Sequence, residues 1–440
     1  MKVAVVGLGH LGCVTAACLT KFGHTIIAYD EDPQVVANLN QGFPPIYEPG
    51  LNKLIIDGTS NNILEFTNIP QKLKDLDIIW ITYDTPLNDL GQGTVNEIIN
   101  KISTLFPYFK QNSLIIISSQ IPVGTTQKIK TFFFHDYNDK QVDFVYSPEN
   151  LRLGKAIDLF LKPDRLIMGI QLESNKKIIE NLLLPIVDKI LWMSVESAEM
   201  TKHAINAFLA TSIVFINELA TLCEYYGADA HSITQGLMTD IRIGPNAYLT
   251  PGSAFSGGTL TRDIHYLIQL SDACKINFNF FQEVLQSNQR HISWIQTKIT
   301  ENIKSLKGKK VAILGLAYKP GTDSIRHSFT INLSLWFNTQ GAIVNAYDPV
   351  IKHLTSDLER IIYLQKDIDS ALYEADIVVI GTECPEFLNI RIDQLGSQLP
   401  MPYLFDMNGF LSQQLEGEEA IKYFKVGGCN KIQHTNEIIK

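Results

Sequence analysis

The sequence predicts two doubly wound α/β domains, each built on a parallel sheet, joined by a long central helix. Two segments are nearly alike, KVAVVGLG from Lys2 and KVAILGLA from Lys310, and each is a short run rich in β-branched residues that ends in glycine. Strand-like and helix-like segments alternate after each of them, which is typical of βαβ units whose sheet is covered on both faces. Between the two halves, residues 197–226 contain neither glycine nor proline, and their apolar residues recur at helical spacing.

Length and composition fit this class. The chain has 440 residues, of which 45% are hydrophobic and 19% charged, as expected for a globular protein of two or three domains. A net charge of −9 without any long Lys/Arg run argues against a nucleic-acid partner. The six cysteines form no Cys-x-x-Cys pair, so we expect free thiols in a reducing compartment and no metal site.

The remaining apolar runs locate the strands and the domain limits. Predicted strands after the first lie at 25–29, 78–82, 114–118 and 143–146 in the first half, and at 343–347, 377–380 and 403–405 in the second. We therefore expect domains at 1–195, 196–300 and 301–440. The central helix is either an internal packing helix or the spine of a homodimer, and the sequence leaves both open.

We also expect a cytoplasmic protein with no membrane contact. The first predicted strand begins at Lys2, which leaves no room for a cleavable signal. The longest apolar stretch, residues 210–222, is interrupted by Asn217 and Glu218, so no membrane-spanning run is predicted.

The first glycine-rich turn predicts a dinucleotide site. GLGHLG at 7–12 follows a strand and opens a helix, and Asp30 ends the next strand. Gly7 permits the tight turn, Gly9 lets the backbone approach a pyrophosphate, and Gly12 lets the helix pack closely on the strand. The carboxylate of Asp30 suits ribose hydroxyls and repels a 2′-phosphate, which favours NAD over NADP. The predicted cofactor residues of this turn and strand are Gly7, Gly9, His10, Leu11, Gly12 and Asp30.

Several further segments resemble, in order along the chain, the UDP-glucose/GDP-mannose dehydrogenase family. The similar segments are PIYEPGL at 45–51, SPE at 147–149 with PDR at 163–165, Lys202 and Asn206 in a helix that continues through FINE at 215–218, residues 251–263, and GLAYKPGTD at 315–323 followed by Arg326. The resemblance covers essentially the whole chain. It implies a Rossmann-like NAD domain, a helical middle, and a Rossmann-like domain that binds the nucleotide of a nucleotide-diphosphate sugar. Members typically oxidise the C6 alcohol twice with two NAD, and commonly dimerise through the central helix.

The resemblance also implies residue roles. Lys202 and Asn206 lie four apart, so they occupy one helix face and can act on one reacting centre. Lysine there would take the alcohol proton or stabilise an oxyanion, and Glu149 would position or activate water. The expected catalytic residues are Lys202, Asn206, Thr259, Asp263 and Glu149. The expected substrate residues are Glu149, Asn150, Leu151, Lys202, Asn206, Tyr248, Gly252, Gly257 and Lys319. Thr85, Gln120 and Arg326 are expected to join the cofactor residues.

The chain departs from the family at its chemical centre. Where the family usually has its catalytic cysteine, four residues before the aspartate, this chain has Thr259, and Arg262 replaces the family's lysine. Gln120 and Leu153 stand where relatives have a small hydroxyl residue and a second acid. A threonine hydroxyl is far less ionised than a thiol and needs a strong adjacent base to act as a nucleophile.

Three hypotheses therefore remain open at this stage. The enzyme oxidises the sugar to the uronic acid through a hydrated aldehyde, it stops after one hydride transfer at a carbonyl sugar, or it binds cofactor and sugar nucleotide without turnover. A phosphogluconate-type 2-hydroxyacid dehydrogenase would share the first domain, but it does not require the second strand–glycine domain from Lys310 onward. Family analogy places the reaction in the synthesis of polysaccharide precursors.

Overall fold

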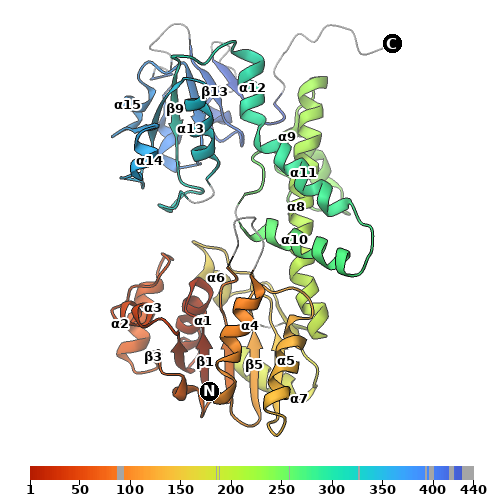
Figure 1. Cartoon of the computed structure of the whole chain (residues 1–440). Helices are drawn as coiled ribbons and strands as arrows, with labels where there is room; N and C mark the ends of the chain where they lie inside the picture. Colours follow the sequence, from red (N-terminus) through yellow and green to blue (C-terminus); the bar gives the residue numbers. More distant parts are fainter. Residues whose placement is uncertain are drawn as a thin grey trace. The chain divides into compact units, whose positions relative to one another are not determined.

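The structure is a computed structural model, which describes residues 1–86, 94–184, 186–187, 189–256, 258–325, 328–391, 394–395, 401–415 and 421–428. It divides into two compact units, Met1–Ile205 and Asn206–Lys440 (Figure 1). The division falls inside the 32-residue helix α8, Val195–Tyr226. The predicted limits at 195 and 300 therefore stay a proposal, since the helices after α8 and the second sheet share one unit.

The first unit is built on an eight-stranded sheet with the order β3-β2-β1-β4-β5-β6-β7-β8. Neighbouring strands are parallel except β6 and β7, which meet antiparallel at Tyr146 and Gly169. The strands are β1 Lys2–Val6, β2 Thr25–Tyr29, β3 Leu64–Thr67, β4 Ile78–Ile81, β5 Ser113–Ile117, β6 Val142–Tyr146, β7 Leu166–Gly169 and β8 Ile190–Met193. The first six strands have the doubly wound order of a dinucleotide-binding fold, as predicted.

Helices cover both faces of this sheet (Figure 1). They are α1 His10–Thr20, α2 Pro33–Asn40, α3 Leu51–Ser60, α4 Val95–Ser103, α5 Thr125–Asp136, α6 Ala156–Leu161 and α7 Ser174–Leu183. Alternate residues of β1 enter different cores: Val3 and Val5 pack in one cluster, Ala4 and Val6 in the other, and all four are 0% exposed. A strand buried on both faces reads as a continuous apolar run, which is why the sequence located β1 directly.

The second unit contains a six-stranded, fully parallel sheet with the order β11-β10-β9-β12-β13-β14. Its strands are β9 Lys310–Leu314, β10 Ile343–Tyr347, β11 Ile362–Leu364, β12 Ile377–Ile380, β13 Tyr403–Phe405 and β14 Lys422–Phe424. Its helices are α9 Ala230–Thr239, α10 Gly258–Ala273, α11 Phe280–Ile292, α12 Trp294–Asn302, α13 Phe329–Thr339, α14 Ser356–Glu359, α15 Ile368–Leu372 and α17 Ser412–Leu415. Both doubly wound sheets and the long central helix are therefore confirmed.

Helix α8 has almost the predicted bounds, 197–226, but it is more apolar than expected. Its 18-residue window has a mean hydropathy of 1.5, so by length and composition it is apolar enough to cross a membrane. The prediction that no run reaches that length was wrong, because it took the interruption by Asn217 and Glu218 as decisive, whereas the mean over 18 residues stays high. The core helix of a globular protein has the same properties. The first turns of α8 favour a core helix, since Glu199, Lys202 and His203 are buried there and paired within the first unit.

Candidate active site

The glycine loop between β1 and α1 has the geometry of a cradle. Gly7 has φ +90°, which other residues rarely adopt. A Cβ on Gly9 would lie 2.1 Å from Oδ2 of Asp84, and one on Gly12 would lie 1.9 Å from the carbonyl oxygen of Gly7. All three positions therefore require glycine: Gly7 for its φ, Gly9 for its close contact with Asp84, and Gly12 for the close approach of α1 to the turn.

Asp30 lies beside this loop at the end of β2. Its Oδ2 accepts a hydrogen bond from the backbone N–H of Leu8 at 2.7 Å, and its Oδ1 accepts one from that of Asp32 at 3.0 Å. Burial raises the pKa of the Asp30 carboxyl above its usual range, and the two backbone hydrogen bonds oppose that shift. The acid is thus held against the glycine loop where a nucleotide ribose would reach it.

The corresponding loop of the second unit is built differently. Gly315 again has a positive φ, +93°, but Ala317 stands where the first loop has Gly9. The carboxylate of Asp348 accepts four backbone hydrogen bonds, from Leu316, Ala317, Val350 and Ile351. Asp348 is 2% exposed, so its carboxylate oxygens are occupied by backbone N–H groups and are not available to a ligand. The dinucleotide features are therefore confined to the first loop.

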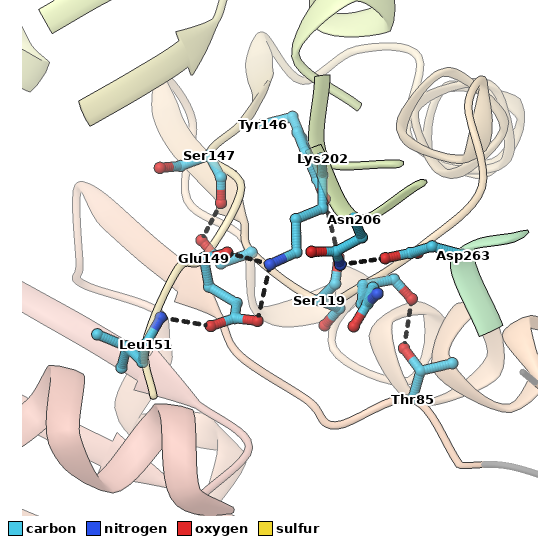
Figure 2. Close-up of polar contacts among 11 residues, drawn as sticks. Thr85, Ser119, Tyr146, Ser147, Glu149, Leu151, Lys202, Asn206 and Asp263 are labelled. Carbon is cyan, nitrogen blue, oxygen red and sulfur yellow. Dashed lines mark hydrogen bonds and ion pairs between the residues drawn. The ribbon is translucent and has the colours of Figure 1, made fainter. Parts of the chain in front are cut away.

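Lys202 of α8 and Glu149, which follows β6, form the polar centre of the first unit (Figure 2). The Lys202 Nζ donates to the carbonyl oxygen of Glu149 at 2.5 Å and lies 3.3 Å from its Oε1. The other carboxylate oxygen of Glu149 accepts from the backbone N–H of Leu151 at 2.9 Å. The lysine is 5% exposed, so its ammonium has left water and depends on these partners.

Two neighbours of Lys202 on α8 fix the helix against the loop after β5. The carboxylate of Glu199 accepts hydrogen bonds from the backbone N–H of Gly124 at 2.6 Å and of Thr126 at 2.9 Å. Nε2 of His203 lies 2.9 Å from the carbonyl oxygen of Ile121. Glu199 and His203 are 0% exposed. Sequence reasoning missed both residues; the available signal was the four-residue spacing of Glu199 and His203, which puts them on one face of the helix.

The same loop carries the substituted position Gln120. The hydroxyl of Thr85 donates to the carbonyl oxygen of Gln120 at 2.5 Å (Figure 2). Both residues are buried, at 6% and 7% exposure. The structure thus brings together two residues that were expected to contact the cofactor, at the carboxyl ends of β4 and β5, where open α/β sheets bind ligands.

A cavity of about 200 Å³ lies within the first unit between α1 and the segment that follows β6. Leu11 and Thr15 of α1 line one side, and Ser147, Glu149 and Asn150 line another. The predicted cofactor residue Leu11 and the predicted substrate residues Glu149 and Asn150 therefore border a single space.

In the second unit, Asn206 of α8 donates a short hydrogen bond from Nδ2 to Oδ2 of Asp263 on α10 (Figure 2). Asp263 is 0% exposed and Asn206 is 6% exposed. The buried carboxylate holds the amide nitrogen of Asn206. The direction in which the amide oxygen points is therefore fixed as well. The structure thus brings together two of the residues expected to be catalytic, on α8 and α10.

Thr259, the second residue of α10, is exposed. It precedes Asp263 by one helical turn, so both lie on the same face of α10. Among the described residues of its own unit, none hydrogen-bonds to the Thr259 hydroxyl. A hydroxyl needs an adjacent base to become a nucleophile, so the second unit alone does not activate it.

The loop before α10 is held by amide and imidazole side chains. Oδ1 of Asn217 accepts from the backbone N–H of Gly252 at 2.9 Å, and Nε2 of His291 lies 2.7 Å from the carbonyl oxygen of Gly252. The backbone N–H of Ser253 donates to Oδ1 of Asn408 at 2.7 Å, and a Cβ on Gly252 would lie 2.3 Å from that oxygen. Gly252 thus needs to be glycine, and Asn217, His291 and Asn408 hold the loop around it.

The remaining substrate candidates are less constrained. Tyr248 is 58% exposed, and Nζ of Lys319 lies 5.5 Å from the ring centre of Tyr318. Gly257 and Arg326 lie outside the described residues. Among the described residues, no group of three or more His, Cys, Asp or Glu side chains could hold a metal ion.

Comparison with known proteins decides the family. The sequence models of the UDP-glucose/GDP-mannose dehydrogenase family match residues 1–187 with the NAD-binding domain, 196–290 with the central domain and 312–413 with the UDP-binding domain. The UDP-glucose 6-dehydrogenase of Rickettsia typhi is 30% identical over 435 residues, which cover 97% of this chain and 99% of the relative. The chain belongs to the UDP-glucose/GDP-mannose dehydrogenase family. It is therefore an NAD-dependent oxidoreductase acting on a nucleotide sugar.

Other relatives agree with this assignment. The UDP-glucose 6-dehydrogenase TuaD of Bacillus subtilis is 31% identical over 425 residues, which cover 96% of this chain and 92% of the relative. A UDP-glucose dehydrogenase structure from Pyrobaculum islandicum matches with a TM-score of 0.85 at 25% identity, over 97% of this chain and 98% of that one. The UDP-N-acetyl-mannosamine dehydrogenase Cap5O from Staphylococcus aureus, at 22% identity and a TM-score of 0.80 over 98% and 99% of the two chains, supports the fold.

Proposed function

We propose that this family member oxidises the C6 alcohol of a UDP-hexose, UDP-glucose first among them, to the uronic acid. The observation that carries the proposal is the ion pair between the buried Lys202 and the half-buried Glu149, on the family's central helix and substrate loop. Full-length relatives named UDP-glucose 6-dehydrogenase support the choice of substrate.

The glycine loop and Asp30 fit NAD. The backbone of Gly9 at the start of α1 suits a pyrophosphate, and the carboxylate of Asp30, which accepts the N–H of Leu8, suits a ribose. We assign the cofactor to these residues with His10, Leu11, Thr85 and Gln120, and Arg326 is kept as a proposed contact. When bound, NAD accepts a hydride from C6.

Residues of this chain accept the proton of the alcohol and hydrogen-bond to the reacting oxygen. Lys202 takes the alcohol proton when neutral and stabilises the alkoxide when charged, and the Asn206 amide, oriented by Asp263, hydrogen-bonds to the same oxygen. Glu149 orients a water molecule that adds to the C6 aldehyde, which gives a gem-diol without any bond to the protein. Thr259 contributes a hydrogen bond only. Tyr248, Gly252, Gly257, Lys319, Asn150 and Leu151 are the proposed substrate contacts.

A second candidate function is favoured by Thr259. Because this chain lacks the thiol that would hold the aldehyde, the intermediate can leave before hydration, and the product is then a carbonyl sugar. Such an enzyme removes two electrons and transfers one hydride per sugar.

One experiment separates these possibilities. NADH formed per sugar is measured under limiting UDP- and GDP-hexoses, with the product mass recorded. Two NADH and a uronic acid support the proposed function, whereas one NADH and a carbonyl sugar support the two-electron enzyme. NAD binding without NADH formation from any sugar contradicts both and points to a binding protein.

We further propose a cytoplasmic homodimer that pairs through α8. Phe208, Phe215 and Leu222 recur every seven residues and are 70%, 51% and 55% exposed, and Tyr225 extends the row at 54%. An exposed apolar row at heptad spacing suits the same row of a second copy. We propose that the product supplies polysaccharide precursors and that 1–195, 196–300 and 301–440 are the functional domains.

A further inference from the structure

The buried carboxylate of Glu48 hydrogen-bonds to two loops that serve different ligands in the proposed function. Its Oε2 lies 2.9 Å from Nε2 of His10 in the glycine loop and accepts the backbone N–H of Gly154 at 2.7 Å. Its Oε1 accepts the backbone N–H of Ala156 at 2.8 Å. Glu48 is 1% exposed, so its charge depends on these three donors.

The backbone of Glu48 is fixed independently of these contacts. Its carbonyl oxygen accepts from the N–H of Leu51, the first residue of α3, at 3.1 Å. Gly50 between them has φ +84°, and its Cβ position lies 3.8 Å from Cδ1 of Ile157 on α6. The carboxylate that joins the two loops therefore extends from a backbone that is itself held by a hydrogen bond.

The segment 149–156 is anchored at its two ends by different groups. At its start, Lys202 binds both the carbonyl and the carboxylate of Glu149. At its end, Glu48 binds Gly154 and Ala156. Gly154 has φ +88°, and apart from its chain neighbours no atom lies within 4 Å of its Cβ position. Ala156, by contrast, is 0% exposed and packs in the hydrophobic core of the unit. The hydrogen bonds of Glu48 therefore hold Gly154, where side-chain packing is absent, and add to the packing at Ala156.

We infer that Glu48 is a positioning residue that couples the cofactor loop to the segment bearing Glu149. When NAD orders the glycine loop, His10 is fixed with it, and Glu48 transmits that restriction to Gly154 and Ala156. That residues 149–156 contact the substrate rests on the proposed function. The coupling between the glycine loop and this segment depends only on NAD binding. Because such coupling is reciprocal, a sugar nucleotide that orders the segment tightens NAD binding by the same factor.

Hydrogen–deuterium exchange of the full chain tests the link. Saturating NAD is expected to slow amide exchange in 149–157 by about fivefold or more, the lower end of ordinary coupling. In Glu48→Gln the slowing falls below about twofold, although the glycine loop remains protected, because the amide cannot accept from all three donors. Glu65→Gln, which alters an exposed glutamate of the same unit, keeps the wild-type response.

A second variant keeps the test decisive if Glu48→Gln fails to fold. His10→Phe cuts the link on the cofactor side and leaves the bonds to Gly154 and Ala156 in place, and it is expected to lose the same protection at saturating NAD. The inference is overturned if NAD protects 149–157 equally in either folded variant, or if it does not protect the segment in the wild type. Failure to oxidise UDP-glucose would refute the proposed function and leave this exchange result standing.

Discussion

Nζ of Lys202 lies 2.5 Å from the carbonyl oxygen of Glu149 and 3.3 Å from its carboxylate. The lysine sits on a helix whose preceding turn is tied to the loop after β5 by Glu199, while Glu149 follows the adjacent strand β6. A single helical segment therefore sets the positions of groups at the ends of two neighbouring strands.

Lys202→Met is expected to lower kcat by about 10²- to 10⁴-fold, the usual contribution of a positioned proton-transfer group. The thioether keeps most of the volume but provides neither a base nor a cation. Steady-state kinetics with UDP-glucose measure the loss, and NAD binding by fluorescence is expected to stay within twofold. The control is Lys128→Met, on the exposed face of α5. A Lys202→Met enzyme with near wild-type kcat would remove the lysine from the mechanism.

Thr259→Val is expected to lower kcat by about two- to tenfold, because only one neutral hydrogen bond is lost. The side chains have similar shape, so the change isolates the hydroxyl. Thr259→Ser, which keeps the hydroxyl, is expected to stay close to wild type. If Thr259→Val instead loses several orders of magnitude and Thr259→Ser does not, the hydroxyl acts as the nucleophile and the hydrate route is wrong.

Local patterns located the parts of the site that are local in sequence. The glycine loop with Asp30 was predictable because each residue has a backbone reason to be there, and Lys202 with Asn206 because one helix carries both. Glu48 was not predictable, since its partners Gly154 and Ala156 are 106 and 108 residues away and only tertiary folding brings them together.

The missed strands have a similar explanation. The strand β3 is four residues long and contains the exposed Glu65, so it lacks the continuous apolar run that identifies a buried parallel strand. The strands β7 and β8 extend the sheet beyond the six-stranded pattern, and β7 pairs antiparallel with β6 through a single residue pair. Neither the two added strands nor the antiparallel pairing of β7 is marked by a local sequence pattern.

Asp30→Asn is expected to weaken NAD binding by about 10- to 100-fold, since hydrogen bonds to a charged acceptor contribute about 1.5–3 kcal/mol. The discrimination against NADP should fall at the same time, because the repulsion of a 2′-phosphate is removed. Dissociation constants for the two cofactors give both numbers. An unchanged ratio of NAD to NADP affinity would show that Asp30 does not face the ribose. Glu65→Gln again serves as the control in the same unit.

The wild-type affinity for NAD is also expected to fall at acidic pH. Burial raises the pKa of Asp30, so its carboxyl takes up a proton at a higher pH than an ordinary aspartate and then accepts ribose hydrogen bonds poorly. Titrating NAD from pH 7 downward tests this. In Asp30→Asn the decline should disappear, and a decline of the same size in the variant would assign it to another group.

His291 predicts a pH dependence of stability in the second unit. Burial lowers its pKa, and the hydrogen bond with the Gly252 carbonyl only partly opposes this shift. The unfolded chain therefore binds a proton near pH 6.5 that the folded chain does not, so the free energy of unfolding falls as the pH drops below about 6.5 and continues to fall until the folded pKa is reached. Thermal unfolding at pH 8 and pH 5 should show a smaller loss in His291→Gln, whose amide can still donate to Gly252. An equal loss in both proteins would mean that His291 binds its proton equally well in the folded and unfolded chains, and would contradict a lowered pKa.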